Sequence, residues 1–377
     1  MVEKPTLLAK LSIIDYGGMA FFFFGSGLVI LAVTWGGATN PWASSAVLVP
    51  LAIGCTTFFS FFVYEYFMVP GKVLSRILPS QEPMIPLSIF YSKDMSLLTY
   101  LNFSTGMALF SVFYFVGIWF TIVQKYDSGK AGTQLLYYTP GLGVGSYLAM
   151  FLCNKWPKET FWPLFFGSTL EPLGIGMLAW ALSRGRINVV DGMLGFAGVG
   201  TGLRIMPGLL HAVGLRSRSK ARGLAVISFS QVFGGTVGIA IMGSVFNNKL
   251  SQYVGGVAHI DAHNTSSIGS IDSLPPAVQA QVRLVVNDAV FWAYIAILPF
   301  LSLAGVLVFF LGNVKITDQK QDSDGEIDTS GNVETPYLWW LVTGKRRRTA
   351  QQQVQLEAPD KNSPQDNRTE GEPTATE

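Results

Sequence analysis

Eight long apolar segments constrain this chain more than any other feature of its sequence. Each approaches the roughly 20 residues that an α-helix needs to cross the hydrocarbon core of a bilayer. They are interrupted mainly by Gly, Pro, Ser and Thr, and they occupy residues 15–34, 45–67, 97–120, 131–152, 162–182, 189–211, 224–246 and 289–312. A segment in lipid must pair its backbone groups internally, so we expect about eight transmembrane helices.

Composition argues against a soluble protein of this length. Of the 377 residues, 49% are hydrophobic and 13% are charged, whereas soluble chains carry about 25% charged residues. The 26 basic and 24 acidic side chains nearly balance, which argues against a nucleic-acid partner. The sequence therefore predicts an all-α integral membrane protein whose first partner is the lipid bilayer.

The distribution of Lys and Arg between the loops predicts the orientation of the chain, because cytoplasmic loops are enriched in these residues. With both termini in the cytoplasm, the inner segments hold thirteen Lys and Arg residues and the outer segments hold six. We expect this orientation, in the plasma membrane or the vacuolar membrane. The outer segment 247–288 carries an Asn-Thr-Ser sequon at Asn264, either a glycosylation site or a chance match.

Four regions follow from the spacing of the segments. Residues 1–68 hold two helices, 69–96 a cytoplasmic loop, 97–312 a six-helix unit, and 313–377 a polar tail that we expect to be disordered. The tail contains an apolar island at 337–342, followed by the basic run 345–348. The island is too short to cross a membrane; it either docks on an anionic leaflet or belongs to a solvated basic stretch.

Two ionisable residues fall inside the apolar segments at matching depth. At 1.5 Å per residue, Glu171 and Arg204 lie on the order of 10–14 Å from the same face. An isolated charge at such a depth costs roughly 2.5–3.5 kcal/mol, so we predict that the two side chains pair, with Gln231 at a similar level on the next helix. The cluster either lines a substrate or proton path or serves as an ion pair that holds helices together.

Weaker cavity candidates lie on the first two helices of the six-helix unit. They are polar or amphipathic side chains, namely Asn102, Gln134, Tyr137 and Tyr138. Both tyrosines fall near the predicted outer face, where anchoring at the membrane interface is the alternative role. Dense glycine runs within three of the helices allow close helix approach, for sliding or for static packing.

Signatures of catalysis are missing from the sequence. We find no His/Cys/Asp cluster at metal-ligand spacing, no Gly-Lys-Ser phosphate loop, and no Ser/His/Asp set at one membrane depth. The two cysteines, Cys55 and Cys153, lie in or next to apolar runs, where they serve as small apolar side chains. We therefore expect a protein that is not an enzyme, has no metal or cofactor, and transports a small molecule.

A glycine-rich run around Arg204 carries a family resemblance. Residues 198–208 read Gly-Val-Gly-Thr-Gly-Leu-Arg-Ile-Met-Pro-Gly, followed by His211, a basic loop, and Phe233-Gly234-Gly235-Thr236. This pattern resembles the C-terminal half of fungal major facilitator superfamily transporters of the fourteen-span drug:proton antiporter type. The run at Trp35-Gly36-Gly37 and the helix end at Tyr64-Glu65 resemble the two linker helices of that group.

The resemblance covers about residues 10–312 and implies a six-helix half preceded by linker helices. It implies proton-coupled export of small organic molecules such as drugs, toxins or siderophore-like compounds. The family has six further helices before these, so we expect an N-terminally truncated form whose partner is the missing N-terminal half or a second copy. Since one half cannot close two gates around a shared site, the alternative is a non-transporting protein that binds a partner or regulates a full-length transporter.

Overall fold

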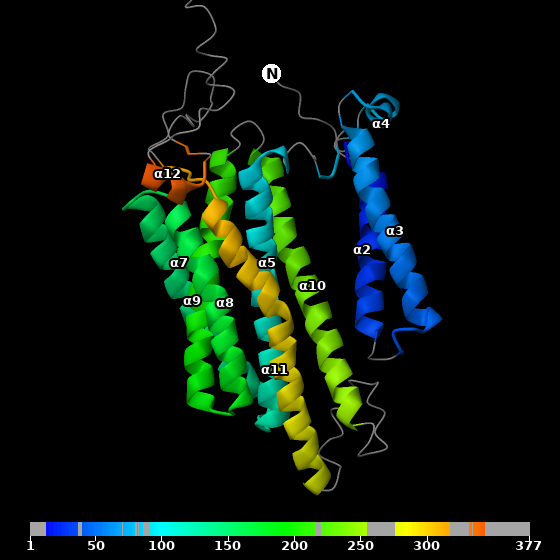
Figure 1. Ribbon diagram of the computed structural model, residues 1–377, viewed down its shortest axis with the longest axis vertical. Coiled ribbons are helices and arrows are strands. Elements are labelled where there is room, and N and C mark those ends of the chain that lie inside the picture. Colours follow the sequence, from blue (N-terminus) through cyan, green and yellow to red (C-terminus); the bar gives the residue numbers. More distant parts are fainter. Residues whose placement is uncertain are drawn as a thin grey trace, which may run out of the picture.

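The computed structural model describes residues 13–36, 40–69, 71–79, 81, 83–85, 90–215, 220–254, 276–316, 332–333 and 335–343. Within these ranges the fold is all α-helical, with isolated β-bridges and no strand. Figure 1 shows long helices running alongside one another as a bundle, with α2 and α3 at one side. By length and apolar composition, seven helical segments of the described residues can cross a membrane. The chain is an all-α integral membrane protein, as predicted.

The long helices correspond to the predicted apolar segments. They are α2 (Tyr16–Trp35), α3 (Ser45–Met68), α5 (Lys93–Ile118), α8 (Phe161–Ser183), α9 (Ile187–Leu215), α10 (Lys220–Val254) and α11 (Pro276–Leu307). A π-helical turn, Trp119–Val123, continues α5, and a 3-10 turn, Val308–Phe310, continues α11. The short helices are α4 (Val73–Ile77), α6 (Ser128–Leu135), α7 (Tyr138–Asn154) and α12 (Tyr337–Thr343).

One predicted span, 131–152, is interrupted in the structure. A turn at Leu136 and Tyr137 divides it between α6 and α7. Pro140 has no N–H to donate to the Leu136 carbonyl, and its ring clashes with that carbonyl, so the helical ladder stops there. The remaining 17 residues of α7 extend only about 25 Å, less than the roughly 30 Å of a hydrocarbon core.

Helix α11 begins well before its predicted apolar segment. Pro276 opens it, in the position that best tolerates a residue without an N–H. Val282 and Val286 bury their side chains against the bundle, so the helix extends as far as it finds a packing partner. Hydropathy alone marks only the more apolar part of this helix.

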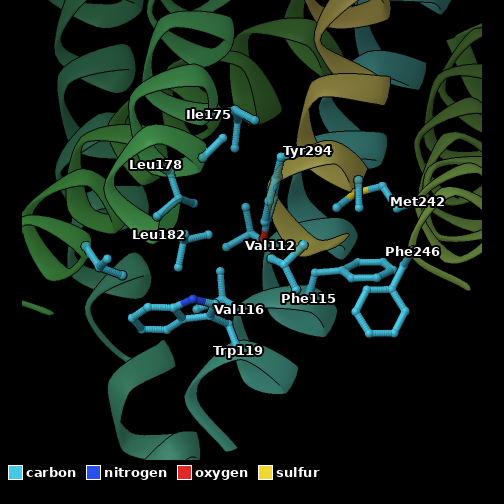
Figure 2. Packing of buried hydrophobic residues seen from close by; sticks show 14 of the residues in the cluster. Val112, Phe115, Val116, Trp119, Ile175, Leu178, Leu182, Met242, Phe246 and Tyr294 are labelled. Atoms are coloured by element: carbon cyan, nitrogen blue, oxygen red, sulfur yellow. The ribbon is translucent and has the colours of Figure 1, made fainter. Parts of the chain in front are cut away.

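The main hydrophobic core lies between α5, α8, α10 and α11. Figure 2 shows Val116 of α5, and Trp119 of the π-helical turn that continues α5, facing Leu182 of α8, with Tyr294 of α11 beside them. The indole nitrogen Nε1 of Trp119 donates a hydrogen bond of 2.6 Å to Asn287 Oδ1. A buried tryptophan needs such a partner for its single donor, and here the partner holds the π-helical turn after α5 to α11.

Glycines bring two helix pairs into close backbone contact. A Cβ on Gly106 of α5 would meet the carbonyl oxygen of Gln231 of α10, and one on Gly234 would meet the carbonyl of Phe103. Gly141 of α7 approaches the Gly195 carbonyl of α9 in the same way. The glycine runs therefore allow close packing of these helices. Sliding of one helix along another stays a prediction.

The two N-terminal helices pack on each other and on α10. Phe22 of α2 lies 5.3 Å from Phe61 of α3 and 4.9 Å from Phe229 of α10, measured between ring centroids. Edge-to-face pairs of this kind suit the ring quadrupoles. The pair is thus attached to the six-helix unit through aromatic side chains.

The beginning of the tail and the segment around α12 are ordered, which differs from the expectation of a tail disordered from residue 313. The Asn313 N–H donates to the Val333 carbonyl at 2.8 Å, and the Val333 N–H donates back at 2.9 Å. The Ile316 N–H donates to the Lys158 carbonyl at 2.9 Å. These segments find backbone partners and bury Val333 and Tyr337, which offsets their loss of conformational freedom. The rest of the tail lies outside the described residues.

Candidate functional site

A buried ion pair joins α8 and α9 near the middle of both helices. An Nη1 proton of Arg204 is donated to Glu171 Oε2, and the side chains are 1% and 0% exposed. The predicted pairing of these residues is therefore present. Their role in a substrate or proton path stays a prediction.

Small residues allow the two helices to approach closely enough for this pair. A Cβ on Gly200 of α9 would lie 2.7 Å from the Glu171 backbone nitrogen, and one on Gly167 of α8 would lie 2.5 Å from Arg204 Cγ. Larger side chains at either position would separate the helices. The glycine-rich sequence around Arg204 thus positions the arginine against its counterion.

Hydroxyl groups extend the ion pair toward α7. Thr201 Oγ1 donates to Glu171 Oε1 at 2.7 Å, and the Tyr138 hydroxyl donates to Thr201 Oγ1 at 2.7 Å. Tyr138 is fully buried, so its side chain is not exposed to lipid headgroups, whereas its neighbour Tyr137 is 49% exposed. The same sequence argument applied to both tyrosines, but the structure places them in different environments.

Arg204 also connects the pair to α5. Its Nη2 protons are donated to the Leu101 carbonyl and to Ser104 Oγ, the latter at 2.7 Å. Among the described residues its Nε has no hydrogen-bond partner. A guanidinium in a low-dielectric interior needs this combination of a counterion and neutral acceptors. The single arginine therefore ties α9 to both α8 and α5.

Asn102 lies beside this network without joining it. Its Nδ2 donates to the Leu98 carbonyl of its own helix at 2.9 Å. The side-chain amide packs against Gly208, where a Cβ would lie 2.9 Å from Nδ2. Gly208 is one helical turn after Arg204, so Asn102 contacts the same helix as the pair at an adjacent level.

The other predicted candidates are not gathered at this site. Gln231 lies on α10 with its backbone against Gly106; in the described chain it forms no hydrogen bond or ion pair with Glu171 or Arg204. Gln134 lies on α6 and Tyr137 on the turn that follows. Asn264 lies outside the described residues.

Sequence reasoning missed Thr201 and Ser104. Thr201 precedes Arg204 by three residues on one helix, and residues at this spacing share a face, so the spacing was an available signal. Ser104 reaches Arg204 from another helix, and no local pattern indicates that contact.

Two carboxylates that the sequence places at helix ends are also buried. Asp15 accepts hydrogen bonds from the Gly18 N–H at 2.8 Å and from the Tyr64 hydroxyl at 3.0 Å. Glu65 Oε1 accepts one from the Ile85 N–H at 3.2 Å. These contacts join the beginning of α2 to the end of α3 and to the loop that follows.

The network around Glu171 has the chemical elements of a proton relay. A carboxylate, a threonine hydroxyl and a tyrosine hydroxyl form a continuous hydrogen-bonded chain, and each member can both accept and release a proton. The adjacent guanidinium takes no part in such a relay, because arginine stays protonated in proteins. Among the described residues, no group of three or more His, Cys, Asp or Glu side chains is placed to hold a metal ion.

Comparison with known proteins finds similarity to membrane transporters. Residues 2–114 match the family described as the fungal trichothecene efflux pump. The chain is similar to the MFS-type efflux pump LUC4 of Fusarium sp, with 26% identity over 343 residues that cover 86% of this chain and 58% of the relative. It is also similar to the MFS transporter L2 of Phoma sp., with 27% identity over 85% of this chain and 52% of the relative.

A third relative is the efflux pump FUS6 of Gibberella moniliformis, with 25% identity over 83% of this chain and 56% of the relative. The chain thus spans about half the length of the curated relatives it matches. Among solved structures it is similar to a bacterial homolog of the human lysosomal transporter Spinster, inward-facing and occupied, with a TM-score of 0.47 and 16% identity over 78% of this chain and 66% of that chain.

The class is therefore a polytopic, all-helical integral membrane protein. Its sequence relatives are fungal efflux pumps and transporters of the major facilitator superfamily.

Proposed function

We propose that this chain supplies a six-helix unit, with α2 and α3 as linker helices, of a proton-coupled exporter of small organic molecules. The observation that carries the proposal is the buried network of Glu171, Arg204, Thr201 and Tyr138. Ionisable residues within membrane spans are costly and commonly mark ion or substrate paths. The names of the relatives, efflux pumps among them, support the direction of transport.

In this proposal Glu171 is the group that gains and loses the proton. When Glu171 is ionised, Arg204 holds α9 against α8. When it is protonated, the attraction weakens, while the Leu101 carbonyl and Ser104 still hold the guanidinium against α5. Protonation would thereby change which helices are tied together, which is the differential interaction that a conformational shift requires.

The proposal places the substrate between this unit and a second six-helix unit, either an N-terminal half or another copy of the chain. It also places both termini in the cytoplasm, in the plasma or vacuolar membrane. The substrate class is small and organic, such as a drug, a toxin or a siderophore-like compound. A non-transporting role, in which the chain binds a partner or regulates a full-length transporter, is the alternative.

Transport in cells tests the proposal directly. The chain is expressed in a yeast strain without its main efflux pumps, and the retention of a panel of fluorescent drugs and toxins is measured with and without a protonophore. We expect lower retention with the wild-type chain, loss of that effect with the protonophore, and loss with Glu171→Gln. Retention equal to that of the empty strain, with the chain inserted in the membrane, would support the non-transporting alternative.

A second measurement separates proton coupling from transport itself. If export persists in the presence of the protonophore and in Glu171→Gln, the exporter assignment stands but the coupling ion is not a proton. Arg204→Lys serves as the matched variant, because it keeps the charge next to Glu171 while removing the planar guanidinium that reaches both neighbouring helices.

A further inference from the structure

Two buried carboxyl groups lie side by side where α2 begins and α3 ends. Asp15 is 4% exposed and Glu65 is 0% exposed. A Cβ on Gly18 would meet Asp15 Oδ2 and would lie 3.1 Å from Glu65 Oε1, so oxygens of both carboxyl groups border the same point. In Figure 1 this is the end of the helix pair from which the chain continues into α4. The two acidic side chains, one at each helix end, therefore share a single buried site.

Hydrogen bonds occupy only one oxygen of each carboxyl group. Asp15 Oδ1 accepts the Gly18 N–H at 2.8 Å and the Tyr64 hydroxyl at 3.0 Å, and Glu65 Oε1 accepts the Ile85 N–H at 3.2 Å. The second oxygens, Asp15 Oδ2 and Glu65 Oε2, are buried, and among the described residues neither has a hydrogen-bond partner. Buried polar atoms are nearly always paired, so these two oxygens indicate that the site takes a ligand.

The described surroundings of this site contribute no cation. The charged groups that act on Tyr64 and Glu65 are each other and Asp15. The exposed Lys72, in the turn after α3, binds the Tyr66 hydroxyl at 3.0 Å instead. Helix α10, which also packs on α2, meets it through aromatic rings. If both carboxyl groups were ionised, two negative charges would therefore face each other in a buried site without a counterion from the described residues.

The ligand that suits this arrangement is a proton. A buried charge without a partner is so costly that the group becomes neutral instead, and when two carboxylates share a site, one of them keeps its proton where an isolated carboxyl group would lose it. A protonated carboxyl group donates its O–H, which brings a donor to a site whose two unpartnered atoms are both acceptors. A divalent ion such as Ca²⁺ takes about six to eight oxygen ligands, and no group of three or more His, Cys, Asp or Glu in the described chain is placed to supply them.

We propose that Asp15 and Glu65 form a proton-binding site, in which the two carboxyl groups hold one proton between them at neutral pH. With the proton bound, the site carries one negative charge, and the neighbouring N–H and hydroxyl groups donate to it. When the proton leaves, two like charges repel each other in a buried site, which weakens the contact between the start of α2 and the end of α3. This site is separate from the Glu171 network and does not depend on transport.

Infrared spectroscopy of the full chain in lipid nanodiscs tests the proposal, because the C=O stretch of a protonated carboxyl group is separate from the bands of a carboxylate. Ordinary carboxyl groups titrate at about pH 4, so a protonated band at neutral pH reports a group with unusual proton affinity. We expect this band in the wild-type chain and its loss in Glu65→Gln. Asp15→Asn removes the like charge, so any remaining band should disappear at a pH lower by about one unit or more.

Two further variants are matched controls. Glu159→Gln removes a buried carboxyl group that has a lysine partner, Lys315 at 3.9 Å, and it should leave the band unchanged. Glu171→Gln removes the group to which we assign proton coupling, and the part of the band that depends on Glu65 should persist in it. The result for this site is therefore independent of the result for the exporter proposal.

The melting temperature of the chain, measured against pH, gives a second readout. Because the folded chain binds the proton more tightly than the unfolded chain, stability should fall as the pH rises above neutral. This fall should be smaller in Glu65→Gln, which resembles the protonated side chain in shape and charge. The series is run in sodium chloride and in choline chloride at equal ionic strength, which separates a proton from an alkali cation.

Two outcomes would overturn the inference. Infrared spectra at neutral pH with the same protonated band in the wild type and in Glu65→Gln would mean that the pair is ionised. A stabilisation by sodium that is lost in Glu65→Gln, without a protonated band in the wild type, would mean that the site binds an alkali cation and not a proton.

Discussion

Thr201 donates a 2.7 Å hydrogen bond to Glu171, which is also the counterion of Arg204, one helical turn further along α9. The carboxylate receives Thr201 on one oxygen and Arg204 on the other. Both donors come from α9, while the acceptor lies on α8. These polar contacts between α8 and α9 therefore converge on one carboxylate, and the consequences of removing each contact can be measured.

Removing the arginine should be more damaging than changing it to lysine. Arg204→Ala leaves a buried carboxylate without its counterion, and loss of one partner of a buried pair costs about 3–5 kcal/mol. Arg204→Lys keeps the charge and should lose less. Thermal unfolding of the purified chain in detergent measures the difference, and equal stability of the two variants would argue against a structural role for the pair.

The hydroxyl relay can be dissected one group at a time. Tyr138→Phe removes the hydroxyl that donates to Thr201. Because Thr201 keeps its own hydrogen bond to Glu171, we expect the free energy of unfolding to fall by only about 0.5–1.5 kcal/mol. Thr201→Val leaves a buried carboxylate oxygen unsatisfied, which should cost about 1–3 kcal/mol. A double-mutant cycle on unfolding free energies checks the coupling, and strictly additive effects would mean that the two hydroxyls act separately.

Two glycines on one helix should respond in opposite ways to alanine. A Cβ on Gly234 would meet the Phe103 carbonyl of α5, so Gly234→Ala should destabilise the chain by about 1–3 kcal/mol through overpacking. Gly243 on the same helix has open space at its Cβ position, so Gly243→Ala should be neutral or gain up to about 1 kcal/mol in helix propensity. Comparison of the two melting temperatures is the measurement, and a similar loss at both sites would exclude the close-packing explanation.

The contact between α12 and the bundle should survive mildly alkaline conditions. Burial, and then the hydrogen bond to Glu159, raise the pKa of Tyr337 above its ordinary value of 10.0. A raised pKa in the folded state means that its stabilising contribution is fully present below pH 10 and is lost only as the pH rises through the higher folded value. Tyrosinate absorbance titrations of wild type and Tyr337→Phe, taken as a difference, isolate this group. A difference that titrates at or below pH 10 would contradict the buried contact.

Much of this architecture was predictable from local pattern. Apolar length identified seven full spans and placed Glu171 and Arg204 at matching depth, because a bilayer imposes one length and penalises every unpaired charge. The break before α7 could also have been predicted, because Pro140 lacks an N–H and its ring clashes with the carbonyl four residues earlier in the same chain segment. The ordered segment around α12 was not, because its stabilising partners are the loop before α8 and the end of α11.

Sequence alone therefore determined that this chain is an all-helical membrane protein, since hydropathy and backbone hydrogen bonding in lipid act locally along each segment. Only the tertiary structure decided that Tyr138 joins the ion pair while Tyr137 is exposed, and that Ser104 and the Leu101 carbonyl bind Arg204. These contacts join residues on different helices. Their formation depends on helix rotation and on the close approach that small residues permit, which no single segment encodes.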